Sequence, residues 1–110
     1  MAWHKEDQII KIRSRDYWVK IVEMLQQNWA VVEEQSDGKI TVYFITDMSD
    51  VFDEIKFDSE QSAYGSLKRN GFKLYAEDKE VQSFLSPPKP PFYKRDHMNN
   101  PIYSSGRFWR

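Results

Sequence analysis

Apolar side chains recur every three or four residues in the first third of the chain. The residues at this spacing are Trp18, Ile21, Val22, Leu25 and Trp29. Side chains three and four positions apart lie on one face of a helix, so the pattern predicts an amphipathic helix over residues 15–28. Ser14, just before it, is a suitable N-cap.

A second pattern, rich in β-branched and aromatic residues, follows. Residues 29–34 and 39–46 flank an Asp-Gly pair at 37–38, which predicts a β-hairpin because the turn needs positive φ angles. Both faces of the second run are apolar, and this is typical of a central strand. Residues 51–57 extend the predicted meander to three strands, and residues 7–13 predict an edge strand.

Shorter elements are predicted in the next part of the chain. Asp58 resembles a helix N-cap, and the apolar stripe of the helix that follows ends at Asn70-Gly71, a pair that commonly stops helices. Residues 72–75 predict a short strand, and residues 78–85 predict a short helix.

Residues 86–110 predict an extended C-terminal segment. Its prolines at 87, 88, 90 and 91 each fix φ and exclude a helix. The segment also holds several large apolar or aromatic residues: Phe92, Tyr93, Ile102, Tyr103, Phe108 and Trp109. A disordered tail seldom contains so many, so we expect it to pack on the domain or on a partner.

Together these elements predict one α+β domain over residues 1–110. We expect an antiparallel sheet of about three to five strands packed with two main helices, followed by the extended Pro- and aromatic-rich segment. The chain has 110 residues, of which 40% are hydrophobic, enough for one modest core.

The absence of cysteine narrows the function classes. It excludes a disulfide framework, a cysteine zinc site and a thiol nucleophile. No apolar run approaches the roughly 20 residues of a membrane helix, and the N-terminus lacks the apolar core of a secretion signal. We therefore expect a cytoplasmic protein without a membrane partner.

The net charge of −1 conceals a strong segregation. Residues 33–60 hold nine acids and two bases, whereas residues 61–110 hold nine bases and four acids. An acidic region attracts a cationic partner and raises its association rate, although surface acids also keep a small protein soluble. Both interpretations remain open at this stage.

Four acids follow one another closely: Asp47, Asp50, Asp53 and Glu54. Their spacing lacks the alternating ligands, central glycine and terminal glutamate of a calcium loop. We expect no metal site and interpret them as surface acids that are able to contact a partner.

Candidates for catalysis are few. The histidines are His4 and His97, and His97 directly follows Asp96, whose side chain would point the opposite way on an extended chain. We expect no enzyme, no catalytic residue and no cofactor. A small enzyme with an unrecognised site, using His97, is kept as an alternative.

A nucleic-acid accessory protein is a second alternative. Bases interleave with aromatic residues in the C-terminal half: Lys68, Arg69, Lys73, Tyr75, Lys89, Tyr93, Lys94, Arg95, Arg107, Phe108, Trp109 and Arg110. Stacking together with phosphate pairing is how single strands are held. The near-neutral total charge and the absence of a nucleic-acid motif argue against this alternative.

The end of the chain offers a candidate interface anchor. Trp and Arg concentrate binding energy at interfaces, so Arg107 and Trp109 are candidate partner-binding residues, unless Phe108 and Trp109 complete the core instead.

Three segments resemble the immunity proteins of bacterial contact-dependent and polymorphic toxin systems. They are Asn70-Gly71-Phe72, residues 87–92 (PPKPPF) and residues 102–109 (IYSSGRFW). The resemblance implies a cytosolic inhibitor that binds a cognate toxin, often a nuclease with a basic active site. The four acids at 47, 50, 53 and 54 would then meet the cationic surface of the toxin.

Overall fold

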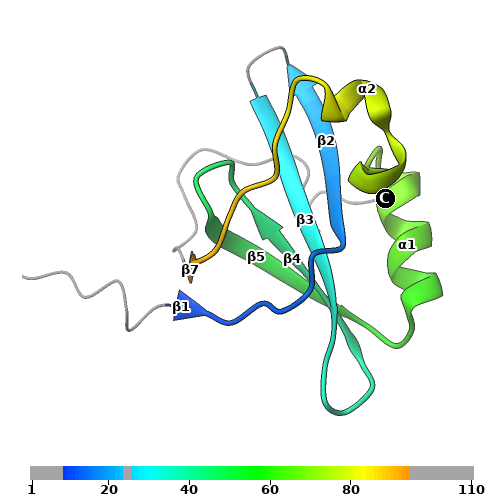
Figure 1. Cartoon of the computed structure of the whole chain (residues 1–110). Helices are drawn as coiled ribbons and strands as arrows, with labels where there is room; N and C mark the ends of the chain where they lie inside the picture. Colours follow the sequence, from blue (N-terminus) through cyan, green and yellow to red (C-terminus); the bar gives the residue numbers. More distant parts are fainter. Residues whose placement is uncertain (1–8, 24–25, 95–110) are drawn as a thin grey trace, which may run out of the picture.

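The computed structural model describes residues 9–23 and 26–94 (Figure 1). Its strands are β1 (Ile9–Ile10), β2 (Tyr17–Glu23), β3 (Gln26–Glu34), β4 (Ile40–Ile45), β5 (Asp50–Phe57), β6 (Lys73–Leu74) and β7 (Phe92–Lys94). Within these residues the strands form one sheet of seven, in the order β1-β7-β5-β4-β3-β2-β6. Neighbouring strands are antiparallel except β5 and β7, which are parallel.

The centre of the sheet confirms the predicted hairpin and central strand. Gly38 has φ of +84°, as the turn between β3 and β4 requires. Strand β4 is buried along its whole length and lies in the middle of the sheet. Strand β5 agrees with the third predicted strand to within one residue.

The predicted helix over residues 15–28 is wrong, because this region contributes β2 and the first residues of β3. Trp18 packs in the core on one side of the sheet, whereas Tyr17 and Val19 pack in the core on the other. A strand buried on both faces is apolar at consecutive positions, so the two-residue period disappears. A subset of such residues then matches helical spacing by coincidence.

The prediction of three to five strands is also wrong, because the sheet has seven within the described residues. The sequence predicted short strands at 7–13 and 72–75, where the structure has β1 and β6. The two strands that it missed are β2, which was predicted as a helix, and β7, whose three residues are too few to show a period. Strands β6 and β7 pair with the edges of the longer strands β2 and β5, and the predicted edge strand at 7–13 is paired only at β1, with β7, within the described part.

One of the two main helices is confirmed. Helix α1 (Glu60–Arg69) begins after Ser59, whose hydroxyl accepts a hydrogen bond from the backbone N–H of Ser62, so the cap lies one residue beyond the predicted Asp58. The helix ends at Asn70, and Gly71 has φ of +92°. The predicted helix at 78–85 is shorter: a 3₁₀ turn (Tyr75–Glu77) leads into α2 (Lys79–Gln82).

Both faces of the sheet are covered, each by a different part of the chain (Figure 1). Helix α1 covers one face, where Leu67 and Phe44 are fully buried. Val81, Leu85 and Phe92, from the chain that follows α1, pack on the other face with Trp29. No described helix is long and apolar enough to cross a membrane.

The extended C-terminal segment packs on the domain as far as the structure describes it. Phe92 is buried, Pro88 is buried, and β7 pairs with both β1 and β5. The candidate residues His97, Arg107 and Trp109 lie outside the described residues, as do Arg95, Phe108 and Arg110.

Candidate functional site

The four candidate acids are distributed along β5 and the turn that precedes it. Asp47 is exposed in the turn between β4 and β5, and Asp50 is half-buried at the start of β5. Asp53 is half-buried and Glu54 is exposed in the middle of the strand. The acids therefore follow one strand instead of gathering around one point.

Asp53 and Glu54 lie on opposite faces of the sheet. Asp53 is paired with Phe44, and Glu54 is paired with Tyr43. Directly opposed residues of antiparallel strands share a face, and Phe44 and Tyr43 belong to the two different cores. The two carboxylates therefore flank the strand from both sides.

These acids do not form a metal centre in the described part of the chain. There, no three histidine, aspartate or glutamate side chains lie close enough together to hold a metal ion. Three of the acids instead share a position on β5, and Asp47 lies in the turn before it.

Among the described residues, most of the outer edge of β5 has no partner strand. Strand β7 pairs with only the first two residues, Asp50 and Val51. From Phe52 to Lys56 no described strand pairs with this side of β5. Every second residue of an edge strand points its N–H and C=O groups outward, so this stretch presents hydrogen-bonding groups to a partner.

One of these outward groups already has a local partner. The backbone N–H of Glu54 donates a hydrogen bond to Oδ1 of Asp53 at 2.9 Å, in an exposed position. A carboxylate over the edge is one way in which native proteins discourage pairing between copies of themselves. The Asp53 carboxylate therefore occupies one of the outward N–H groups of this edge.

A further acid, Glu33, lies on the same face of the sheet as Glu54. Glu33 is in β3 and Glu54 is in β5, so Tyr43 of β4 lies between them. Burial raises the pKa of the Tyr43 hydroxyl, the hydrogen bond from Gln35 lowers it, and the charges of Glu33 and Glu54 raise it further. Sequence reasoning did not single out Glu33, because its proximity to Glu54 comes from the pairing of β3, β4 and β5.

The carboxylate of Glu33 also holds the segment that joins β1 to β2. Its Oε1 accepts hydrogen bonds from the backbone N–H groups of Arg13 and Ser14, the latter at 2.9 Å. Ile12, beside them, is buried in the core. This segment forms no strand of its own, and it is held by the Glu33 side chain and by one backbone hydrogen bond from the Val32 N–H of β3 to the Asp16 C=O, so no periodic signal indicated its position.

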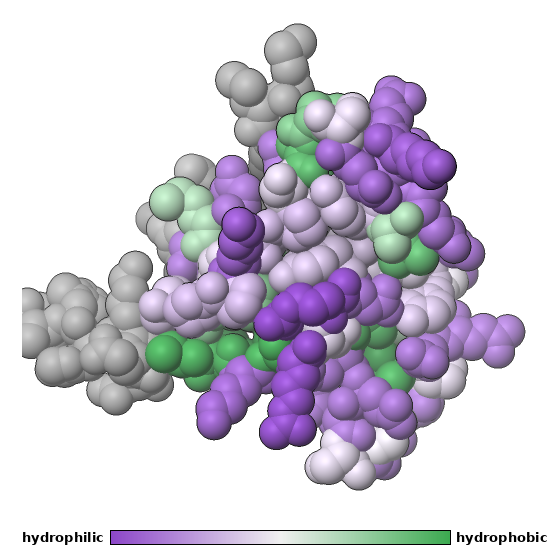
Figure 2. Space-filling view, in the orientation of Figure 1, coloured by the Kyte–Doolittle hydropathy of each residue, from purple (hydrophilic) through white to green (hydrophobic). Residues whose placement is uncertain are grey.

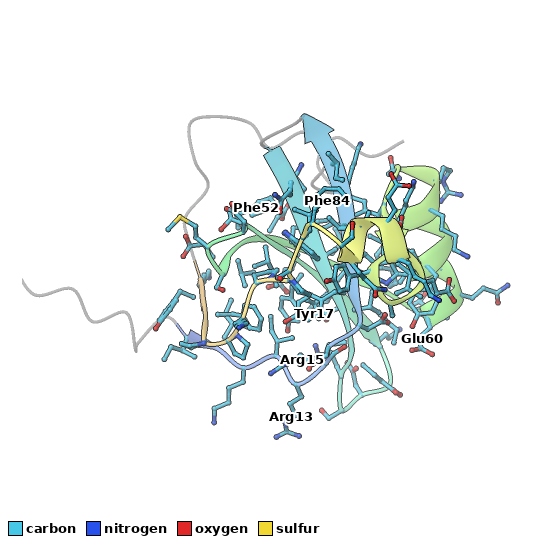
Figure 3. All side chains as sticks on the ribbon, turned by 45° about the horizontal axis from the view of Figure 1, so that its top comes forward. Arg13, Arg15, Tyr17, Phe52, Glu60 and Phe84 are labelled. Carbon is cyan, nitrogen blue, oxygen red and sulfur yellow. The ribbon has the colours of Figure 1, made fainter. Side chains whose placement is uncertain are left out.

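A second pair of carboxylates, Asp16 and Glu60, meets at the hydroxyl of Tyr64 near the start of α1. The hydroxyl of Tyr64 donates to Oδ2 of Asp16 at 2.7 Å and contacts Oε2 of Glu60 at 3.3 Å. Burial, the hydrogen bond to Asp16 and the two negative charges all raise the pKa of Tyr64. The ring of Tyr64 also packs against Trp18, so the hydrogen bond to Asp16 and the ring contact together hold α1 on the sheet. Glu60, at the start of this helix, is labelled in Figure 3.

The basic candidates of the C-terminal half are separated by the fold. Lys68 and Lys73 line a groove of about 340 Å³ beside Trp18, where Lys73 also lies 3.9 Å from Asp78. Lys94 lies in β7, which is at the other side of the sheet from β6 and Lys73. The described bases of this half therefore do not form one continuous surface.

Comparisons with known proteins give no further guidance: no family model matches the chain, and neither a curated protein nor a solved structure is detectably similar to it.

Proposed function

We propose that this chain is a non-catalytic, protein-binding inhibitor whose contact surface is the open edge of β5. The observation that supports it is the unpaired stretch from Phe52 to Lys56 among the described residues, flanked by Asp53 on one face and Glu54 on the other. An exposed strand edge is a recognised docking mode for an extended segment of a partner, and the side chains that flank the edge select that segment.

The chemistry of this edge selects the partner. A strand that pairs with β5 must reach the N–H of Glu54, which Asp53 now occupies. A lysine or arginine on the incoming strand forms an ion pair with the Asp53 carboxylate and draws this carboxylate away from the Glu54 N–H. The freed N–H then donates a hydrogen bond to a backbone carbonyl of the partner. A neutral strand gains nothing from that exchange, so the edge favours a cationic one.

The class of partner comes from the sequence resemblance to immunity proteins. Such proteins neutralise a toxin by binding it, and a basic nuclease surface matches the acids of β5 in charge. We therefore propose a toxin with a cationic strand or loop as the partner, and Asp47 and Asp50 as acids that extend the contact surface toward the start of β5.

The experiment is a protection assay in cells that express a candidate toxin, chosen from the genes that neighbour the one encoding this chain. The wild-type chain should restore growth, and Asp53→Lys/Glu54→Lys should abolish the protection. Glu77→Lys/Glu80→Lys is the matched control, since it reverses two exposed acids near α2 and should protect like the wild type. Equal protection by both double variants, or none by the wild type, refutes the proposal.

A biochemical measurement separates binding from expression. The purified toxin and chain should co-elute in gel filtration, and reversal of the two β5 acids should weaken the complex by about tenfold or more. The circular dichroism spectrum of the variant should match that of the wild type. An unaltered complex would exclude the β5 edge as the contact surface.

A further inference from the structure

A second surface, on the β1 side of β7, is strongly cationic. Lys11, Arg13 and Arg15 are all exposed and line a groove of about 460 Å³. Its other walls are apolar and include Ile9, Pro90 and Pro91. Among the described residues no acid lines this groove, which we call the cationic groove. Its volume lies within the range typical of ligand sites.

The figures show the same arrangement. In Figure 2, apolar atoms form a band along the chain that follows β1, and hydrophilic side chains project from beside it. In Figure 3 the side chain of Arg13 extends away from the ribbon. Charge and apolar surface are therefore side by side in the cationic groove.

The cations of the groove are held on a fixed backbone. The Glu33 carboxylate binds the N–H groups of Arg13 and Ser14, and Glu33 and Glu34 line an adjoining groove with Lys11 and Arg13. Arg15 donates to the carbonyls of Ile12 and Ser14 at 2.8 Å, and its guanidinium lies 6.0 Å from the centre of the Phe92 ring. A ligand does not need to order this segment when it binds, so little affinity is lost to conformational entropy.

The charges of Lys11 and Arg13 are available to a ligand. Neither side chain forms an ion pair within the described residues, and Glu33 is committed to the backbone. Backbone groups of the segment are committed as well: Asp16 C=O accepts from Val32 N–H, and Arg15 C=O accepts from Tyr17 N–H. Recognition here therefore depends on side-chain charge and apolar contact, not on strand addition.

The side chains of the groove indicate the form of the ligand. Arg15 is bound to the carbonyls of Ile12 and Ser14, so Lys11 and Arg13 supply the charge, and apolar residues lie directly beside them. A peptide in which carboxylate and apolar side chains alternate presents both kinds of group to such a surface. Its intervening side chains suit the apolar wall of Ile9, Pro90 and Pro91.

We propose that the cationic groove binds an extended acidic peptide in which carboxylate and apolar side chains alternate. This surface is independent of the proposed inhibitory edge, which selects a cationic partner. The chain would accordingly be able to hold two protein segments of opposite charge at once.

The test uses a short fluorescent peptide of alternating glutamate and valine, measured by fluorescence anisotropy at low and physiological salt. We expect saturable binding that weakens as salt rises. Lys11→Glu/Arg13→Glu should weaken it by about tenfold or more, and Lys68→Glu/Lys79→Glu, which reverses two exposed cations elsewhere, should not. Arg15 is left intact because it supports the backbone.

Control ligands decide the class of partner. A peptide of the same composition with all glutamates before all valines should bind more weakly. Equal binding of that peptide, tighter binding of a single-stranded oligonucleotide of equal charge, or no binding of the alternating peptide overturns the proposal. Lys11→Gln/Arg13→Gln provides a second variant with a smaller charge change, in case charge reversal impairs folding.

The two proposals can fail separately. Asp53→Lys/Glu54→Lys should leave peptide binding at the cationic groove unchanged, and Lys11→Gln/Arg13→Gln should leave toxin protection unchanged. If either change impaired both activities, the two surfaces would not be independent and this inference would be wrong.

Discussion

The hydroxyl of Tyr17 donates a buried hydrogen bond to the carbonyl oxygen of Pro88 at 2.8 Å. Tyr17 lies in β2, and its ring meets Trp29 edge-to-face with the ring centres 6.1 Å apart. One side chain thus joins the start of β2 to the proline segment. The apolar wall of the cationic groove, Pro90 and Pro91, belongs to the same segment.

We predict that Tyr17→Phe lowers the free energy of unfolding by about 1–3 kcal/mol, because it leaves the buried carbonyl of Pro88 without its donor. Urea unfolding measures the loss. Tyr75→Phe is the comparison, since Tyr75 makes a similar bond to the Leu85 carbonyl at 2.7 Å in a less buried position and should lose less. Equal stability of Tyr17→Phe and wild type would contradict a structural role for the bond.

Stability should decrease at high pH. The pKa values of Tyr17, Tyr43 and Tyr64 are raised above their ordinary value of 10, chiefly by burial. Above pH 10 the unfolded chain loses these protons while the folded chain retains them, so the unfolded state is favoured. The stabilisation is complete below pH 10 and is lost as the pH rises toward the folded-state values.

The measurement is urea unfolding at a series of pH values from neutral to about 11. Tyr64→Phe should make the decrease above pH 10 shallower, because one of the three perturbed groups is removed. The same substitution also removes the bond to Asp16, so the variant should be less stable at neutral pH. An unchanged slope would show that Tyr64 titrates alike in both states.

Two proline substitutions test whether the edge of β5 is open. Glu54→Pro removes an N–H that bonds only the side chain of Asp53, so the strand should tolerate it with a modest loss. Ile55→Pro removes an N–H that, by alternation, faces β4, and should cost about 3 kcal/mol or more. Thermal unfolding distinguishes them. Equal losses would mean that the outward side of β5 is occupied.

Two glycines should respond to alanine in opposite directions. Gly65 lies on the exposed side of α1 with nothing within 4 Å of an added Cβ, so Gly65→Ala should stabilise by about 0.5–1 kcal/mol. Gly71 has φ of +92°, and an added Cβ would lie 3.2 Å from Cε of Lys20, so Gly71→Ala should destabilise by about 1–2 kcal/mol. Differential scanning calorimetry of the pair tests both signs, and destabilisation by Gly65→Ala would contradict the first.

Local signals in the sequence were enough for the hairpin at Gly38, the central strand β4 and helix α1, because each depends on turn chemistry, capping or periodicity within a few residues. They were not enough for β2. Its residues alternate between two cores, and the second core exists only because Val81, Leu85 and Phe92 cover that face from far along the chain. A one-sided sheet would have preserved the two-residue period.

The candidate surfaces, like the strands, could be predicted only where the signal is local in the sequence. The acids at 53 and 54 could be selected from charge alone, but their placement on two faces of an open edge follows from the register of β5 with β4. The cationic groove could not be predicted. It forms where the chain around Arg13 meets Pro90 and Pro91, and nothing in either segment specifies that contact locally.

Strand β7 lies between β1 and β5, so the order of the sheet differs from the order of synthesis. The meander from β2 to β5 and helix α1 consist of neighbouring segments and are able to fold as they leave the ribosome. Ile9 and Ile10 are made before this meander, whereas their partners Tyr93 and Phe92 are made after it. A nascent chain therefore keeps β1 without its described partner, and one apolar face of the sheet uncovered, until Phe92 has been made, and binding by a chaperone protects it most during that interval.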